Sequence, residues 1–118
     1  MEKIVIEGKA KLSGEVKISG AKNAVLPIMT AALMGNGSSS LTNVPNLKDT
    51  RTMIELLEII GAKCNFKNGS LQIDAEKIEN PEAPYDLVKT MRASFYVLGP
   101  LIARCGYVKV SLPGGCAW

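Results

Sequence analysis

Residues 49–74 read DTRTMIELLEIIGAKCNFKNGSLQID and carry the strongest fold signal, because a helix pattern passes directly into a hairpin pattern. Asp49 or Thr50 can cap the helix, and Gly61 stands where helices usually end. Asn68-Gly69 supplies the positive φ angles of a tight turn between strands at Lys63–Phe66 and Ser70–Asp74. The apolar face of the helix lies opposite Arg51, Glu55 and Glu58, and its members are Met53, Ile54, Leu56, Leu57 and Ile60.

The run before this stretch predicts a buried helix and a strand. Residues Ala21–Met34 are apolar nearly all round, which is typical of a buried helix, and Ser19 is a candidate N-cap. Pro27 lies inside the run, so either the first turn is distorted or the regular helix begins near Pro27. Ser39–Val44 follows as a strand.

Two segments at the N-terminus alternate apolar and polar side chains, as half-buried strands do. They are Lys3–Glu7 and Lys11–Ser19, separated by Gly8. From Lys11 to Asp74 the expected order is strand, helix, strand, helix, strand, strand. This order is a βαβαββ unit, which places the chain in the α/β (α+β) class.

A second unit is expected to begin after residue 80. Pro81 and Pro84 predict a loop, after which Asp86 or Thr90 can cap a third helix. This helix is expected to run to Arg104 with a kink at Pro100, and Tyr107–Leu112 reads as the next strand.

Composition excludes several classes of function. The 118 residues contain no histidine, which excludes a Ser-His-Asp or Cys-His arrangement within the chain and deprives zinc of its usual nitrogen ligands. We expect neither a metal nor a cofactor. No apolar run approaches the roughly 20 residues of a membrane span, and no signal peptide is recognisable, so a cytoplasmic protein without membrane contact is expected. The net charge of +3 is interleaved and only 5% of residues are aromatic, which supports a nucleic-acid surface poorly.

Two cationic side chains are candidates for anion binding. Lys22, in Ser19-Gly-Ala-Lys-Asn23, lies at a helix start, where unpaired N–H groups and the dipole favour an anion. A solvated surface lysine is an equally good interpretation of Lys22. Arg92 lies near the start of the third helix, against the dipole, where a guanidinium can bind an anion in bidentate fashion. An exposed arginine in a surface salt bridge is the alternative.

Cys116 is the candidate reactive thiol. Pro113, Gly114 and Gly115 precede it and make a loop in which backbone can approach a ligand closely. A loop thiol near cations has a lowered pKa and can act as an acid or a nucleophile. Cys64 and Cys105 fit better as structural thiols, and the odd number and wide spacing of the three cysteines predict reduced side chains.

Four separated motifs together resemble those of the UDP-N-acetylglucosamine enolpyruvyltransferase family, in the family's order. They are Ile18-Ser-Gly-Ala-Lys22-Asn23-Ala-Val-Leu-Pro-Ile28, Asn43-Val-Pro-Asn-Leu-Lys-Asp49, Tyr85-Asp-Leu-Val-Lys-Thr-Met-Arg-Ala-Ser94 and Leu112-Pro-Gly-Gly-Cys116. The resemblance implies transfer of the enolpyruvyl group of phosphoenolpyruvate to the 3′-hydroxyl of UDP-N-acetylglucosamine, with release of phosphate, in the first committed step of peptidoglycan synthesis. It also implies roles for individual residues: Lys22 and Asn23 bind phosphoenolpyruvate, Arg92 contacts the UDP-sugar, and Cys116 is the general acid, forms a covalent adduct and is alkylated by fosfomycin.

The resemblance further implies the inside-out α/β barrel of the enolpyruvyltransferases, with one βαβαββ unit complete and a second truncated. Residues 1–21 are then strands that belong to the other, C-terminal-side domain. Residues 22–118 are a truncated part of the domain that carries the cysteine loop. The family is much longer and continues differently after the cysteine, where this chain has Ala117-Trp118. We therefore expect the remainder of the enzyme to be missing and the 118 residues alone to lack turnover.

Three alternatives stay open. Enolpyruvylshikimate-phosphate synthase shares the fold and the early lysine, but typically has serine after that lysine and lacks the cysteine loop. A stand-alone βαβαββ module that binds nucleic acid or an anion suits the mild positive charge. A non-functional truncated remnant would expose apolar surface and fold poorly.

Overall fold

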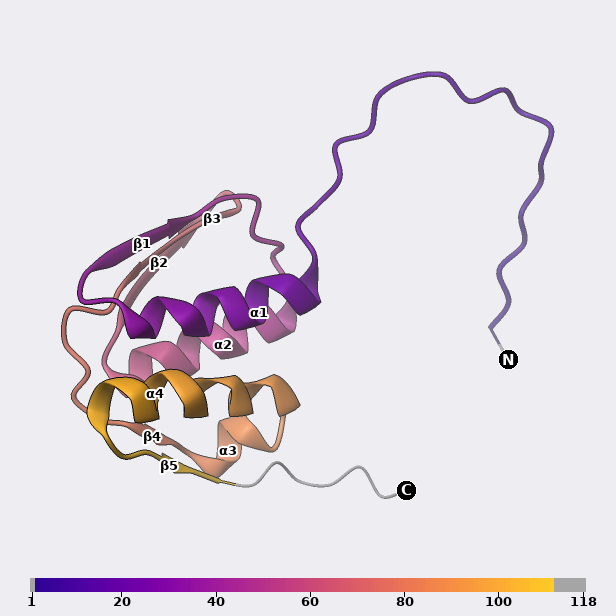
Figure 1. Cartoon of the computed structure of the whole chain (residues 1–118). Coiled ribbons are helices and arrows are strands. Elements are labelled where there is room, and N and C mark those ends of the chain that lie inside the picture. Colours follow the sequence, from indigo (N-terminus) through magenta and orange to yellow (C-terminus); the bar gives the residue numbers. More distant parts are fainter. Residues whose placement is uncertain (1, 112–118) are drawn as a thin grey trace.

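A three-stranded antiparallel sheet, covered on one face by two long helices, forms the centre of the fold in the computed structural model, which describes residues 2–111 (Figure 1). The strand order β1-β3-β2 places the last strand of the hairpin in the middle. The helices and strands are α1 (Lys22–Ala31), η1 (Ala32–Met34, a 3₁₀ helix), β1 (Ser38–Leu41), α2 (Lys48–Ile60), β2 (Lys63–Lys67), β3 (Ser70–Asp74), β4 (Glu82–Ala83), α3 (Tyr85–Val88), η2 (Arg92–Val97, 3₁₀), α4 (Leu98–Cys105) and β5 (Lys109–Val110). The predicted mixed α/β class is confirmed.

The hairpin of β2 and β3 forms as its turn residues predict. Asn68 has φ of 51° and Gly69 has φ of 75°, so both central residues are left-handed, as a two-residue type I′ turn requires. The strands pair in register from Lys67 opposite Ser70 to Lys63 opposite Asp74. β1 then pairs with the free edge of β3, which is why β3 is buried most deeply of the three.

Helix α2 follows the predicted periodicity, and its C-terminal end follows the predicted signal. Gly61 adopts φ of +117°, and its backbone N–H donates to the carbonyl of Glu58. The predicted cap is wrong: Leu47 is the N-cap and no side chain caps this end, so Asp49 and Thr50 lie inside the first turn. Because neither residue caps the backbone, both side chains are available for other contacts.

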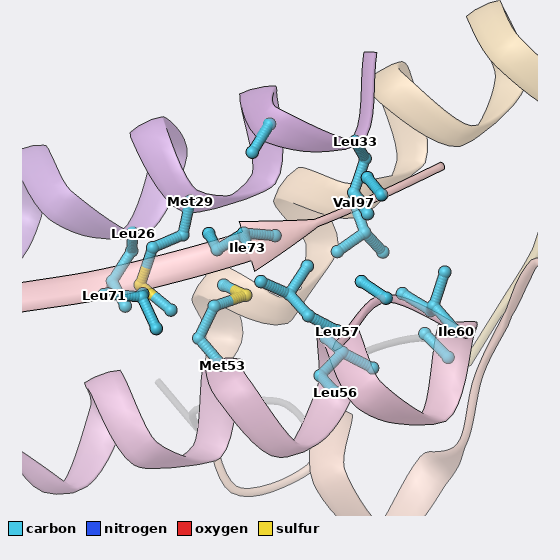
Figure 2. Packing of buried hydrophobic residues seen from close by; sticks show 14 of the residues in the cluster. Leu26, Met29, Leu33, Met53, Leu56, Leu57, Ile60, Leu71, Ile73 and Val97 are labelled. Atoms are coloured by element: carbon cyan, nitrogen blue, oxygen red, sulfur yellow. The ribbon is translucent and has the colours of Figure 1, made fainter. Parts of the chain in front are cut away.

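The core lies between the sheet and the two long helices (Figure 2). Leu71 and Ile73 of β3 are fully buried on the face that meets α1 and α2. Their fully buried apolar partners from α1, η1, α2 and η2 are Met29, Leu33, Met53, Leu56, Leu57, Ile60 and Val97. Apolar residues recur every second position in the strand and about every 3.6 positions in the helices, so each element has one apolar face, and these faces form a single buried layer.

Helix α1 begins at Lys22 and continues through Pro27. Ala21 is the N-cap, so the expectation of a cap at Ser19 is wrong, and so is a start near Pro27. Proline removes the N–H that would bond to the Asn23 carbonyl, but both residues are exposed, so water can satisfy that carbonyl. The Thr30 hydroxyl donates to the Pro27 carbonyl at 2.9 Å and closes the next turn.

The strands expected at Lys3–Glu7 and Lys11–Ser19 are not formed, so the described part of the first unit is αβαββ rather than βαβαββ. Ile4 is 91% exposed and Leu12 is 94% exposed. An alternating segment is stable as a strand only when a sheet edge pairs its backbone and a core covers its apolar side. Residues 2–21 have neither partner in this structure.

The third helix is interrupted at a different place from the one predicted. α3 ends at Val88, and α4 begins only at Leu98, after the 3₁₀ segment η2. Pro100 is the third residue of α4, where an N–H has no partner within the helix, so the proline removes no hydrogen bond from α4. The predicted strand at Tyr107–Leu112 is reduced to β5, which pairs in parallel with β4, and Leu112 lies outside the described residues.

The side chain of Arg104 joins α4 to the first unit through three carbonyl groups. Its Nη1 donates to the carbonyl of Leu33 at 3.0 Å and to that of Gly35 at 2.6 Å. Its Nη2 donates to the carbonyl of Glu76 at 2.9 Å. These contacts hold the C-terminal end of α4 against the end of η1 and the segment after β3.

Candidate functional site

The chain enters α1 by passing very close to the loop after β1. A Cβ atom on Gly20 would lie 2.0 Å from the carbonyl oxygen of Asn43, so only glycine fits there. The side-chain amide of Asn43 also donates to the carbonyl of Ile18, at 3.5 Å. The first turn of α1 is thus held beside the loop that leads into α2.

This arrangement brings Lys22 of α1 against Asp49 of α2. The Lys22 ammonium lies 2.9 Å from Oδ2 of Asp49, and the side chains are 48% and 32% exposed. The ion pair shows that the first turns of the two helices lie together, and α1 packs along α2 (Figure 1). Two helix N-termini and an ammonium therefore share one end of the helical layer, an arrangement suited to an anion.

The ion pair shows that the Lys22 ammonium contacts a neighbouring helix, and anion binding by Lys22 stays a prediction. The sequence pattern indicated Asp49 only as a cap and not as a contact of Lys22, although Asp49 ends Asn43-Val-Pro-Asn-Leu-Lys-Asp49, one of the four family motifs.

Asn23 and Arg92 are exposed. Asn23 follows Lys22 on the first turn of α1, so the structure places this predicted pair together. Arg92 is the first residue of η2, and η2 packs against α1. Among residues 2–111, Arg92 makes no ion pair, in contrast to the surface salt bridge that was the alternative.

Two buried hydroxyl groups lie close in sequence to these residues. Thr50 follows Asp49 and Ser94 is two residues after Arg92, and both side chains are fully buried. Neither hydroxyl oxygen has a hydrogen-bond partner within the described part of the chain. Buried groups of this kind are usually satisfied by ordered water.

Among the cysteines, Cys64 is a structural thiol. Burial raises the pKa of Cys64 to about 12, and the negative charge of Glu58 adds to the increase. Cys105 is half-buried at the end of α4. Cys116, the predicted reactive thiol, lies outside the described residues, so its role stays a prediction.

Two further observations concern the kind of site. Within residues 2–111 the structure contains no group of three or more side chains of the types that hold a metal ion. A groove of about 290 Å³ runs between α1 and β1 and is lined only by uncharged residues, among them Ala24, Ile28 and Leu41. A polyanion therefore fits the end of the helical layer at Lys22 better than this groove.

No helix in the described part of the chain has the length and apolar character needed to cross a membrane.

Comparison with known proteins shows the family to which the chain belongs. The sequence profile of the EPSP synthase (3-phosphoshikimate 1-carboxyvinyltransferase) family matches residues 6–118, and the chain belongs to this family. Within it, the chain is 56% identical over 117 residues to UDP-N-acetylglucosamine 1-carboxyvinyltransferase 2 of Carboxydothermus hydrogenoformans and 55% identical over 118 residues to UDP-N-acetylglucosamine 1-carboxyvinyltransferase of Dichelobacter nodosus. Each match covers 99% of this chain, which spans 28% of the length of either relative.

A solved structure supports the same assignment. The enolpyruvyl transferase NikO from Streptomyces tendae superimposes with a TM-score of 0.71 at 29% sequence identity, over 80% of this chain and 22% of that chain. The predicted relationship to the enolpyruvyltransferases is confirmed in sequence and in fold.

Proposed function

We propose that this chain forms the N-terminal part of an enzyme that transfers the enolpyruvyl group of phosphoenolpyruvate to the 3′-hydroxyl of UDP-N-acetylglucosamine and releases phosphate. The observation that carries the proposal is the identity of 52–56% to UDP-N-acetylglucosamine 1-carboxyvinyltransferases along the whole chain. The position of Lys22 where two helices begin supports it, because phosphoenolpyruvate is a small polyanion.

Each candidate residue has a part in this proposal. Lys22 and Asn23 bind phosphoenolpyruvate, whose carboxylate and phosphate need cationic and hydrogen-bonding partners. Arg92 contacts the UDP-sugar, for which an exposed guanidinium without an ion pair in residues 2–111 is suited. Cys116 acts as the general acid toward the methylene carbon and is the nucleophile that phosphoenolpyruvate and fosfomycin modify.

The proposal extends to the cellular role and to domain organisation. The reaction is the first committed step of peptidoglycan synthesis in the cytoplasm, and so contributes to cell-wall biogenesis, cell shape and division. Residues 1–21 belong to one domain of the intact enzyme and residues 22–118 to the other. Because the chain spans only 28% of the relatives' length, the 118 residues alone are proposed to lack turnover.

A chimeric enzyme tests the function directly. Residues 1–116 of this chain replace the matching segment of the Carboxydothermus hydrogenoformans relative, and phosphate release from phosphoenolpyruvate is measured with and without UDP-N-acetylglucosamine. We expect phosphate release that depends on the UDP-sugar. A folded chimera that releases no phosphate would contradict the proposal.

Single substitutions in the chimera assign the residues. Lys22→Ala is expected to lower kcat/KM by about 10²-fold to 10³-fold, the loss typical when one group that stabilises transition-state charge is removed. Lys63→Ala is the matched control, because Lys63 lies on β2 just after the opposite end of α2. Equal losses in the two variants would remove the assignment of Lys22.

A further inference from the structure

The partner of Lys22 has the same chemistry as the ligand proposed for it. Asp49 places a carboxylate oxygen 2.9 Å from the Lys22 ammonium, the distance at which a carboxylate or phosphate oxygen of a ligand would bind. Asp49 also lies in the first turn of α2, where the dipole favours a negative charge. A side chain of the protein thus occupies a position with the properties of an anion site.

The charges explain why this contact forms. An ammonium in the first turn of α1 is opposed by the helix dipole, so Lys22 gains from a nearby negative charge. Both side chains are partly exposed, and ion pairs of this kind contribute only about 0–1 kcal/mol to stability. The contact is therefore weak enough for an incoming anion to replace it.

We propose that Asp49 acts as an internal competitor, which occupies Lys22 in the free site and is exchanged for the anionic substrate on binding. This inference rests on the proposed function, since it concerns the site where phosphoenolpyruvate would bind. An anion that shares the ammonium with Asp49 lies roughly 5 Å from a like charge, and one that displaces it must break the ion pair. In both cases Asp49 weakens the binding of anions at Lys22.

Asp49→Asn tests the competition in the 118-residue chain, with inorganic phosphate as the probe. Phosphate is titrated into ¹⁵N-labelled protein, and the dissociation constant is taken from the amide shifts of Lys22 and Asn23. We expect phosphate to bind about tenfold more tightly in the variant at low ionic strength, and about threefold more tightly near 0.15 M salt, because salt screens the repulsion. Asp49→Ala serves as a second variant if the asparagine variant does not fold.

Glu82→Gln is the matched control. Glu82 pairs with Lys109 at 3.0 Å, so this substitution removes one negative charge and one lysine–carboxylate pair, as Asp49→Asn does. The control changes the net charge equally but is expected to leave phosphate binding at Lys22 unchanged. In Lys22→Ala/Asp49→Asn the gain is expected to disappear.

The outcomes separate this inference from the proposed function. Phosphate binding that is unchanged or weaker in Asp49→Asn overturns the inference, the weaker result because Asp49 would then position Lys22 instead of competing for it. Absence of phosphate binding in both proteins overturns it as well. An inactive chimera together with tighter phosphate binding in Asp49→Asn would overturn the proposed function and leave the competition by Asp49 intact.

Discussion

Replacing Arg104 by methionine removes the guanidinium that ties α4 to the first unit, while keeping most of the apolar length of the side chain. Three hydrogen bonds are lost, at 3.0, 2.6 and 2.9 Å from the carbonyls of Leu33, Gly35 and Glu76. They are not equivalent, because the bond to Leu33 is partly buried whereas the other two are exposed. Water can replace the guanidinium at the two exposed carbonyls more readily than at the Leu33 carbonyl.

The expected loss follows from this difference in burial. A hydrogen bond from a charged donor contributes about 1.5–3 kcal/mol when shielded, and much less when exposed, so Arg104→Met is expected to cost about 2–3 kcal/mol in the free energy of unfolding. For a folded region of this size, that loss lowers Tm by roughly 10–20 °C. Arg104→Lys is expected to lose less, because its ammonium can still donate to the partly buried carbonyl.

Urea denaturation followed by circular dichroism, together with a thermal melt, measures both quantities. Arg51→Met is the control, since Arg51 makes one exposed hydrogen bond, from Nε to Oδ1 of Asn46 at 2.9 Å. It is expected to change the free energy of unfolding by less than about 0.5 kcal/mol. If Arg104→Met is as stable as the control, the three contacts do not hold α4 in place and the reasoning fails.

Three further substitutions or treatments test the fold. Gly61→Ala is expected to lower the free energy of unfolding by about 1–3 kcal/mol, since φ is +117° and the new Cβ would lie 2.9 Å from the backbone nitrogen of Glu79. Urea denaturation measures this loss. An unchanged urea midpoint would contradict the strained geometry. Leu57→Ala removes a fully buried side chain and is expected to cost about 2–5 kcal/mol in the same assay, whereas a loss below 1 kcal/mol would mean that the core is not packed as described. Cys64 is expected to react slowly with iodoacetamide at pH 8 and faster as the pH rises toward its pKa of about 12. Peptide mass spectrometry measures the extent of labelling. Labelling at pH 8 as fast as in urea-unfolded protein would show that the thiol is not shielded.

Local signals determined the parts of the fold that the sequence predicted well. Asn68-Gly69 specifies a tight turn because both residues adopt positive φ angles, and Gly61 ends α2 because it too adopts a positive φ angle. The 3.6-residue period of α2 matches the buried positions Met53, Leu56 and Leu57. Each of these depends on neighbouring residues only, so no knowledge of the rest of the chain was needed.

Contacts between distant segments decided the rest. Lys11–Ser19 has the pattern of a strand but forms none and stays exposed, because strand formation depends on a partner edge that its own residues cannot supply. Pro100 was expected to kink a long helix, yet the regular α-helix is interrupted between Val88 and Leu98. The proline lies in the first turn of α4, where its missing N–H has no partner to lose.

In the candidate site, too, the sequence indicated some of the residues, whereas the tertiary structure decided which of them are in contact. The sequence alone indicated Lys22 and Arg92 as partners for anions, since residue type and position at helix starts are visible there, whereas Asn23 was indicated only by the family resemblance. That Lys22 is held by Asp49, a residue 27 positions further along the chain, follows only from the packing of α1 on α2. Side-chain charge is a property of the sequence, but which opposite charge faces it is decided by the tertiary structure, because helix packing sets the distance between them.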